Sequence, residues 1–378
     1  MFTLQEALEA IKNKPEFRCN EREYGYVIDY AVAFAESFKG STPRETLILQ
    51  NLRGTCFDHS GKIIRLAYHK FHNLNENAEY AEENFPMGVP HVVQEKLDGS
   101  MITPIPMPDG SWKFGTRAGV TEVADKAMAL LKSWEVGSYQ KYAAYVKLIE
   151  SMLAVNHTVI FEFCSREQRI VIDYPEPFLA VTGVRCNETG EYKSNRTLRW
   201  FVQNPRIIVA RTISDHRGLG DLAKKVSGLL GEEGVVVKFD DGRFVKIKAA
   251  DYCLKHRALD GLRNEKDVLQ LVLKNELDDV LPLVTPEVRD RLVAYNESVW
   301  YRLNLAQQEM VGCFDRLKHL TSKKEFAEMV KDSVYKQGLF KMYDGKNYQL
   351  KDFVLTKCGS STDVESVRWL IGKSYLEF

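Results

Sequence analysis

The chain has 378 residues, of which 44% are hydrophobic and 28% charged, as is typical of a soluble globular protein with two or three domains. Because 52 Lys and Arg residues balance 52 Asp and Glu residues, whole-chain charge does not indicate nucleic-acid binding, and any phosphate contact must come from a local patch. No apolar run approaches the ~18 residues of a membrane span and no signal peptide is recognisable, so we expect a cytoplasmic protein whose cysteines are reduced.

The first two thirds of the chain alternate between helix and strand patterns. Residues 3–13 are predicted to form an amphipathic helix, and residues 120–155 carry apolar side chains at three- and four-residue steps, which also indicates helix. Residues 219–230 are predicted to form a further helix. The strand-rich segments, several of them ended by Asp-Gly turns, are residues 24–66, 90–118, 158–163, 169–174, 179–185 and 234–248.

After about residue 254 the pattern indicates helix alone. Thr285-Pro286 is a favourable helix start, with proline at the first helical position. The apolar stripe that follows, at steps of three and four residues, consists of Val288, Leu292, Tyr295, Val299, Leu303 and Ala306. We therefore predict an α+β fold in which a domain with antiparallel sheets, residues 1–254, precedes an all-helical domain, residues 255–378.

The most informative strand pair lies within residues 233–248, where Asp241-Gly242 indicates a two-residue hairpin turn. That turn would place Val237 opposite Lys246 and leave Lys238 on the other face. The residues that share the first face would be Glu233, Val235, Val237, Lys246 and Lys248. Two lysines so close repel each other unless an anion or a carboxylate lies between them. The hairpin alone leaves open a polyphosphate site and a solvated face with a Glu–Lys contact.

Lys96 stands at the end of a predicted strand, just before the turn Asp98-Gly99. Taken alone, it would be an ordinary surface lysine, but its place in the order of charged residues adds information. Glu162 follows between two phenylalanines of a predicted strand, and then come Glu233-Gly234 and Lys246-Ile247-Lys248. Glu162 by itself could equally be the solvent-facing residue of an amphipathic strand.

In this order and combination, these residues resemble the covalent nucleotidyltransferases, which comprise DNA ligases, RNA ligases and mRNA capping enzymes. The resemblance is closest to the RNA ligase family of T-even bacteriophages and covers about residues 24–254. Four further segments are similar to that family: Leu52–Phe57, Lys70–Glu76, Asn187–Tyr192, and Lys246–Lys248 followed by Tyr252. His72 and Arg117 depart from the family, which usually has an aromatic residue and a lysine there. The fork of an arginine is not equivalent to an ammonium.

The resemblance implies a ligase reaction in three steps. ATP would transfer AMP to Lys96, AMP would pass to the 5′-phosphate of RNA, and a 3′-hydroxyl would then attack that end as AMP leaves. Lys96, Glu233, Lys246 and Lys248 would be the catalytic residues. A free lysine has a pKa of about 10.4, so we expect burial, Lys246, Lys248 and Mg²⁺ to lower the pKa of Lys96. The same cations would stabilise charge on the phosphates.

Carried over residue by residue, the resemblance also implies a nucleotide site. Its members would be Tyr30, Arg53, Lys70, Asp98, Gly99, Arg117, Glu162, Glu233, Lys246 and Lys248. Glu162 and Asp278 would bind the metal, Mg²⁺ or alternatively Mn²⁺, although the pattern around Asp278 favours a helix-surface aspartate. Asp98 would order metal-bound water, and Tyr252 would support the RNA steps.

The biological setting follows from the resemblance alone. The substrates would be ATP and single-stranded RNA ends, such as a broken tRNA anticodon loop that is repaired during phage infection in the host cytoplasm. The enzyme would be a monomer without membrane contact, and residues 255–378 would set RNA choice. Two alternatives stay open: a DNA ligase or capping enzyme, although these usually continue into a small β-barrel, and an RNA-binding protein with an inactive site.

Overall fold

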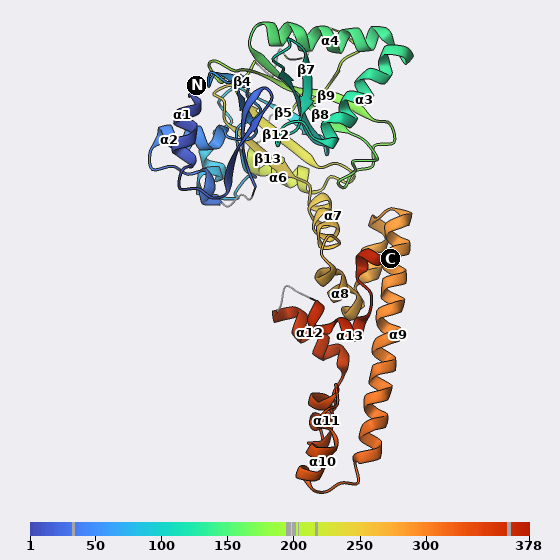
Figure 1. The fold of residues 1–378 in the computed structure, drawn as a ribbon. Coiled ribbons are helices and arrows are strands. Elements are labelled where there is room, and N and C mark those ends of the chain that lie inside the picture. Colours follow the sequence, from blue (N-terminus) through green and yellow to red (C-terminus); the bar gives the residue numbers. More distant parts are fainter. Residues whose placement is uncertain (32–34, 194–197, 199–201, 203, 216–217, 361–363) are drawn as a thin grey trace. The chain divides into compact units, whose positions relative to one another are not determined.

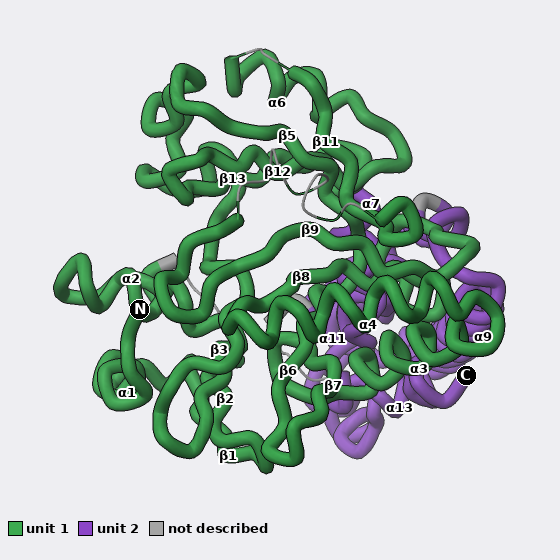
Figure 2. Tube along the Cα trace, turned by 90° about the horizontal axis from the view of Figure 1, so that it is seen from above, with its two compact units in different colours: residues 1–253 green, residues 254–378 purple. Residues whose placement is uncertain are grey.

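The computed structural model describes the chain except residues 32–34, 194–197, 199–201, 203, 216–217 and 361–363 (Figure 1). It divides into two compact units, Met1–Cys253 and Leu254–Phe378 (Figure 2). Helix α7, Ala250–Gly261, runs across that division. Within the described residues, the strands all belong to the first unit and the second unit is helical.

The first sheet is built from the N-terminal segment. Its antiparallel order is β1 (Phe17–Arg22), β2 (Gly25–Tyr30), β3 (Thr55–Phe57) and β4 (Ile63–Arg65). Helices α1 (Leu4–Ile11) and α2 (Pro43–Asn51) share a buried apolar cluster with it. Helix α2 corrects the prediction of strands throughout residues 24–66. Thr42 caps this helix and Pro43 lies in its first turn, a start signal that the surrounding strand pattern concealed.

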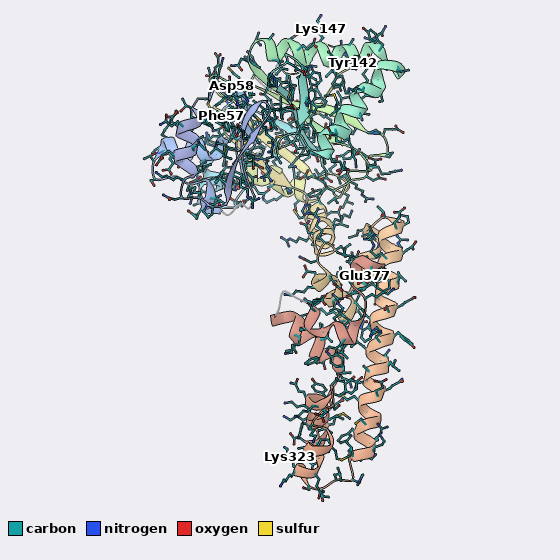
Figure 3. All side chains as sticks on the ribbon, viewed as in Figure 1. Phe57, Asp58, Tyr142, Lys147, Lys323 and Glu377 are labelled. Carbon is teal, nitrogen blue, oxygen red and sulfur yellow. The ribbon has the colours of Figure 1, made fainter. Side chains whose placement is uncertain are left out.

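The second sheet carries two helices on one face. Its order is β10 (Ile208–Val209), β9 (Phe178–Cys186), β8 (His157–Cys164), β6 (Ser100–Pro106) and β7 (Trp112–Gly115). The pairs are antiparallel except β10 with β9. Helices α3 (Glu122–Gly137) and α4 (Tyr139–Ala154) bury their apolar stripes against this sheet. Tyr145 of α4 donates to the Leu179 carbonyl at 2.7 Å, while Lys147 of the same helix is exposed (Figure 3).

The third sheet holds the predicted lysines. Its antiparallel order is β11 (Thr212–Ile213), β5 (His91–Lys96), β12 (Gly234–Phe239) and β13 (Phe244–Lys248). Helix α6 (Leu219–Ser227) covers one face through a buried apolar cluster that includes Val235, Val237 and Val245. The opposite face of the third sheet is therefore the face on which a binding site can form.

The loop between β12 and β13 has three residues, 240–242, where the sequence predicts two. Gly242 donates its backbone N–H to the Phe239 carbonyl at 3.0 Å, and Phe239 donates to the Arg243 carbonyl at 2.9 Å. Gly242 has φ +89°, the left-handed conformation that such a three-residue loop requires. An Asp-Gly pair alone does not fix the loop length, because both loop types place glycine in that conformation.

The longer loop moves the hairpin register by one residue. Val236 pairs with Lys246, and Gly234 pairs with Lys248. Lys238 consequently shares the face of Lys246 and Lys248, whereas the prediction placed it on the opposite face. The predicted pairing of Val237 with Lys246 is wrong for the same reason. The two lysines of β13 still share one face, since their spacing of two residues does not depend on register.

Residues 169–174 form no strand, contrary to the prediction. The Asp98 carboxylate accepts the backbone N–H groups of Val171 and Ile172 at 2.8 and 2.7 Å. Arg166 pairs with Asp173 at 2.7 Å in the same segment. Side chains therefore take up backbone donors that a strand would use in a ladder.

The second unit is built around one long helix. Helix α9 (Pro286–Leu317) begins after Thr285 as predicted, and its predicted stripe from Leu292 to Ala306 is buried. The helices that complete this unit are α8 (Glu265–Lys274), α10 (Lys323–Met329), α11 (Lys336–Tyr343), α12 (Leu350–Ser360) and α13 (Arg368–Ile371). The predicted class, α+β with antiparallel sheets followed by helices, is confirmed. None of the described helices is both long and apolar enough to cross a membrane.

Candidate active site

The turn before β12 brings a carboxylate to Lys96. Lys96 ends β5 opposite Gly234, whose φ of +141° is unfavourable for any side chain. A Cβ on Gly234 would lie 2.1 Å from the Ile247 carbonyl oxygen, so only glycine fits. Glu233, the preceding residue, places Oε2 2.6 Å from Lys96 Nζ and Oε1 3.1 Å from Lys248 Nζ. One carboxylate thus bridges two predicted catalytic lysines.

The carboxylates keep Lys96 charged. Burial would lower the pKa of Lys96, but Glu233 and Glu162 outweigh it, so that pKa lies above its ordinary value. The expectation of a lowered pKa for Lys96 is therefore wrong for the protein's own side chains, because the carboxylates outweigh burial and the neighbouring lysine Lys246. The charge of Glu233, in direct contact, decides the balance.

A cavity of about 300 Å³ opens between the second and third sheets, next to Lys96. Its lining is Arg53, Tyr68, Lys70, Phe71, Gln94, Glu95, Lys96, Leu97, Gly99, Met101, Glu162, Thr182, Val236, Lys238, Lys246 and Lys248. Of the predicted site residues, the cavity brings together Arg53, Lys70, Lys96, Gly99, Glu162, Lys246 and Lys248. Tyr30, Asp98, Arg117, Glu233, Tyr252 and Asp278 are not part of this lining.

Glu162 belongs to the cavity and not to a solvated strand face. It lies on β8 opposite Met101 of β6, between Phe161 and Phe163, which are buried under α3 and α4. Burial raises the pKa of Glu162 to about 7, although the Lys96 ammonium partly counteracts this. The carboxyl can therefore be either a hydrogen-bond donor or an anion near neutral pH.

Four cations other than Lys96 and Lys248 line the cavity, namely Arg53, Lys70, Lys238 and Lys246. Burial, with the charges of Lys70 and Lys96, lowers the pKa of Lys246 to about 8. Burial likewise lowers the pKa of Lys70. The buried Nε of Arg53 has no hydrogen-bond partner among the described residues. Cations that are crowded together and incompletely paired favour an anionic ligand.

Tyr30 and Arg117 form a separate cluster beside this lining. The Arg117 guanidinium lies 4.1 Å from the centre of the Tyr30 ring and pairs with Asp29 at 3.1 Å. Lys70 Nζ lies 5.9 Å from the centre of the same ring. Burial raises the pKa of Asp29 to about 6, with Arg117 opposing. Tyr30 therefore contacts both Arg117, which departs from the family pattern, and Lys70, a cation that lines the cavity.

Asp98 and Tyr252 bond to each other within the first unit. Tyr252 donates its hydroxyl to Asp98 Oδ1 at 2.7 Å, and Oδ2 of Asp98 accepts two backbone N–H groups. Lys248 Nζ lies 4.9 Å from the centre of the Tyr252 ring. Asp98 is only 2% exposed. These contacts connect the turn after Lys96 to the segment after β13.

Asp278 lies in the second compact unit. It is an exposed residue of the short 3-10 helix Leu277–Asp279 and lines a cavity there with Asn296 and Trp300. Its predicted metal role stays a prediction.

Few carboxylates are available near Lys96 for the predicted metal ion. Among the described residues, no group of three or more His, Cys, Asp or Glu side chains is arranged to hold a metal ion. Glu162 and Glu233, which both act on Lys96, offer two carboxylates. Mg²⁺ is often bound by one or two carboxylates together with substrate phosphates. The residues therefore fit a metal that is bound jointly with a nucleotide.

Lys238 is a cavity residue that the sequence prediction missed. It is 2% exposed, and its ammonium donates to Tyr68 Oη at 2.8 Å and to the Thr182 carbonyl at 2.7 Å. The wrong hairpin register placed it on the opposite face. Its spacing of two residues from Val236 and four from Gly234 would have indicated the correct face if the loop length had been known.

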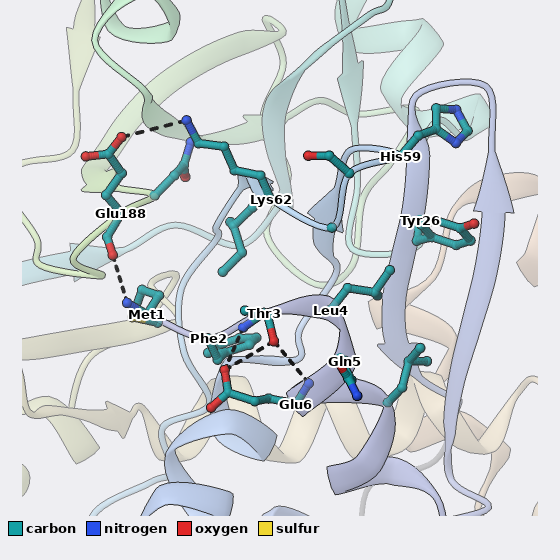
Figure 4. Close-up of a pocket in the computed structure, with 15 residues that line it drawn as sticks. Met1, Phe2, Thr3, Leu4, Gln5, Glu6, Tyr26, His59, Lys62 and Glu188 are labelled. Carbon is teal, nitrogen blue, oxygen red and sulfur yellow. Dashed lines mark hydrogen bonds and ion pairs between the residues drawn. The ribbon is translucent and has the colours of Figure 1, made fainter.

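Two larger cavities contain none of the predicted catalytic lysines. One of about 940 Å³ is lined by the N-terminal helix, where Thr3 and Glu6 form a capping box and Met1 N donates to the Glu188 carbonyl (Figure 4). Another of about 1140 Å³ lies beside the loop of residues 240–242. Neither contains Lys96, Lys246 or Lys248, so the smaller cavity is the candidate active site.

Comparison with known sequences identifies relatives of one kind. The model of a family described as RNA ligase matches residues 51–258, more than half of the chain. A protein of Thermovibrio ammonificans that is provisionally named an RNA ligase is 26% identical over 344 residues, which cover 87% of this chain and 85% of that protein.

Solved structures with a partial likeness carry related names. An archaeal ATP-dependent RNA ligase matches with a TM-score of 0.39 and 18% identity, over 56% of this chain and 52% of that one. Naegleria gruberi RNA ligase with PPi matches with a TM-score of 0.39 and 16% identity, over 50% and 58%. The chain thus spans little more than half the length of these solved ligases.

Proposed function

The chain belongs to the RNA ligase family, and from this premise we propose that it uses ATP to join 5′-phosphate and 3′-hydroxyl ends of single-stranded RNA through a lysyl-AMP at Lys96. The observation that carries the proposal is the cavity beside Lys96, in which Arg53, Lys70, Lys246 and Lys248 accompany Glu162. A triphosphate is the ligand that such a group of cations fits.

The first step requires a neutral amine. Lys96 Nζ would lose its proton to the Glu233 carboxylate, 2.6 Å away, and attack the α-phosphorus of ATP. A P–N bond forms, the bond from the α-phosphorus to the bridging oxygen breaks, and pyrophosphate leaves. Lys246 and Lys248 would neutralise the charge that grows on the phosphate oxygens.

A divalent metal, Mg²⁺ or Mn²⁺, would add Lewis-acid stabilisation of the phosphates when bound. Glu162 and Glu233 are the residues that would hold it, with the phosphates completing its ligands. Glu162 would otherwise contact the ribose. Arg53 and Lys70 would bind the outer phosphates, and Arg117, Tyr30 and Gly99 would border the nucleotide.

The later steps involve RNA. AMP would pass from Lys96 to the 5′-phosphate, forming a 5′-5′ pyrophosphate, and a 3′-hydroxyl would then attack that phosphate and release AMP. Tyr252 would support these steps, and the helical unit would set RNA choice. Asp98 would order metal-bound water, and Asp278 would bind metal. Repair of a broken tRNA anticodon loop in phage-infected cytoplasm, by a monomer, is the biological setting that we propose.

Labelled ATP with Mg²⁺ tests the proposal directly. Wild-type protein should acquire an acid-labile AMP that mass spectrometry locates on Lys96. Lys96→Ala should take up no AMP and join no RNA from ATP, yet retain some joining of pre-adenylated RNA, because the last step does not use the amine as a nucleophile. Undiminished AMP uptake by this variant, or AMP on another residue, would refute the assignment. A wild-type protein that binds RNA but takes up no AMP would favour an inactive binding protein.

A further inference from the structure

A further cavity, of about 640 Å³, lies within the helical unit. The short 3-10 helices Leu277–Asp279 and Leu281–Leu283 border it on one side, and α9 borders it on the other. Its volume is within the range of about 300–1,000 Å³ that small-ligand sites have. Apart from Asp278, the residues that line this cavity have no role in the proposed reaction.

One wall of this cavity is a stripe of polar and aromatic side chains on α9. Asn296, Trp300 and Asn304 line it at steps of four residues, and residues at this spacing share one face of a helix. The two asparagines therefore lie about 6 Å before and after the tryptophan along the helix axis. Trp300 also packs partly against the apolar core of the unit, which fixes its indole. A flat ring stacked on Trp300 would have an amide group beside each of two opposite edges.

The amide groups of the cavity are not used within the protein. Among the described residues, none forms a hydrogen bond with the side chains of Asn275, Asn296 and Asn304. An amide has two N–H donors and a carbonyl acceptor, which match the mixed donors and acceptors on the edges of a nucleic-acid base. No arginine or lysine, the residues that favour a phosphate, is found among the described lining residues. The cavity itself therefore fits a base and not a phosphate.

A cation lies beside the indole, outside the lining. Lys351 Nζ is 6.0 Å from the centre of the Trp300 ring, and no carboxylate in the described part of the chain forms an ion pair with Lys351. A base that stacks on Trp300 brings its own phosphate with it, and this ammonium would neutralise that charge. An aromatic ring for the base, with positive charge for the backbone, is the combination by which proteins bind single-stranded nucleic acids.

We propose that this cavity binds one unpaired base of the RNA substrate, which stacks on Trp300 and forms hydrogen bonds at its edges with Asn296 and Asn304. The base must be unpaired, because a paired base is stacked within its own helix and cannot be placed on an indole. This inference rests on the proposed function, since it takes RNA as the substrate. It adds the residues through which the helical unit would choose that RNA.

The experiment measures how the full chain joins an RNA hairpin that is broken in its loop, at saturating ATP. Each unpaired nucleotide, except the two that are joined, is replaced in turn by an abasic ribonucleotide. With wild-type protein, one replacement should raise the KM for RNA at least about fivefold while kcat changes little, as for the loss of one stacked base. Trp300→Ala should raise the KM for unmodified RNA by a similar factor and should no longer respond to that replacement. Trp300→Phe, which keeps an aromatic ring, should restore part of the response.

Two results would overturn the inference. One is a wild-type KM that no abasic replacement changes, and the other is a Trp300→Ala variant that responds to the replacements as wild type does. Tyr301→Ala is the matched control, because it removes the next aromatic side chain of α9, which is 71% exposed and outside the cavity lining, and it should leave the KM unchanged. Wild-type protein that forms no lysyl-AMP from ATP would instead overturn the proposed function.

A second measurement needs neither a substitution nor catalysis. It decides the matter if Trp300→Ala does not fold or if wild-type protein forms no lysyl-AMP. The same RNA, with 4-thiouridine at one unpaired position at a time, is cross-linked to wild-type protein by near-ultraviolet light, and mass spectrometry identifies the modified peptides. Cross-links from one position should map to residues 293–304 of α9. Cross-links confined to other segments, or equal cross-linking of residues 293–304 from every unpaired position, would contradict a site for a single base.

Discussion

Lys96 and Glu233 form a contact of 2.6 Å in which the predicted nucleophile is held as an ammonium. The carboxylate that suppresses the nucleophile is also the group placed to accept its proton. Binding of a triphosphate near Lys246 and Lys248 would compete for these cations and alter the balance. In the proposed reaction, Lys96 would therefore be activated by a change in the charges around it and not by an intrinsic property of the amine.

Glu233→Gln is expected to lower the pKa of Lys96, because the amide keeps the size of the side chain but removes the charge that raises that pKa. The measurement is the pH dependence of Lys96 acylation, followed by mass spectrometry. Its midpoint should move to lower pH in the variant. Glu232→Gln, which changes the neighbouring exposed carboxylate paired with Arg211, is the matched control and should leave the midpoint in place. An unchanged midpoint in Glu233→Gln would contradict the electrostatic explanation.

Glu162 should make stability depend on pH. Its pKa rises from 4.5 to about 7 on folding, so its stabilising contribution is complete below pH 4.5 and is lost as pH rises through 7. Glu162→Gln cannot ionise and should remove up to about 3 kcal/mol of that decline. Urea unfolding at about pH 5 and about pH 8 measures the free energy of unfolding of both proteins. The contributions of Lys238 and Lys246 change with pH in the opposite direction, but they are present in both proteins and cancel in the difference between them. If the difference in free energy of unfolding between the two proteins did not change with pH, a raised pKa of Glu162 on burial would be excluded.

The sequence predicted which residues line the cavity better than it predicted the contacts and pKa values of those residues. Arg53, Lys70, Lys96, Glu162, Lys246 and Lys248 were all named from motifs, and the fold brings them to one cavity. The pKa direction of Lys96 could not be predicted, since it depends on a carboxylate contact that the turn at Gly234 creates. The contacts of Asp98 could not be predicted either, because its backbone partners lie 73 and 74 residues further along the chain and Tyr252 lies 154 residues further.

At the scale of elements, the length of one loop decides which side chains enter the cavity. The Asp-Gly pair correctly predicted a hairpin, but a loop of three residues instead of two moved Lys238 to the other face. Period-two patterns assign residues to two faces only after the register is known. Long helical stripes have no such weakness, which is why α9 was predicted with its correct start and buried face.

Gly234→Ala is predicted to disturb this hairpin. The added Cβ would lie 2.1 Å from the Ile247 carbonyl oxygen and 2.8 Å from Lys248 Cα, at a φ that side chains rarely adopt. We expect a stability loss of more than about 1 kcal/mol and a larger loss of AMP uptake, because β13 carries the two lysines that we propose to bind phosphate. Thermal unfolding and labelled-ATP uptake measure the two effects. Gly88→Ala, with open space around the new Cβ, is the control, and equal effects of the two substitutions would contradict the prediction.

At the scale of the whole molecule, the balance of charge conceals the site. The 52 basic and 52 acidic residues cancel, yet the cavity is lined by Arg53, four lysines of the third sheet and Lys70, against two glutamates. Local concentration of one sign is what attracts a polyanion. Composition alone could not have predicted this concentration, because it depends on strands that are far apart in the sequence.

Deleting residues 262–378 should leave self-adenylylation largely intact, since every residue that lines the cavity precedes residue 249. The deletion keeps α7 and removes the apolar cluster of the second unit. Joining of a tRNA-derived substrate relative to an unstructured oligonucleotide should change, because RNA choice is assigned to the missing helices. Circular dichroism verifies folding, and the same truncation carrying Lys96→Ala gives the background. A folded truncated protein that takes up no AMP would contradict this division of labour.

The Lys96–Glu233 pair also affects how readily the Lys96 amine can be chemically modified. Cyanate, aldehydes and acyl phosphates in cells are electrophiles that neutral amines attack, and a protonated amine lacks the lone pair that this reaction needs. Modification of Lys96 by such a compound would remove the amine on which the proposed transfer of AMP depends. The Glu233 carboxylate would protect the Lys96 amine from these compounds by keeping it protonated. The same carboxylate would have to release Lys96 before the proposed reaction with ATP.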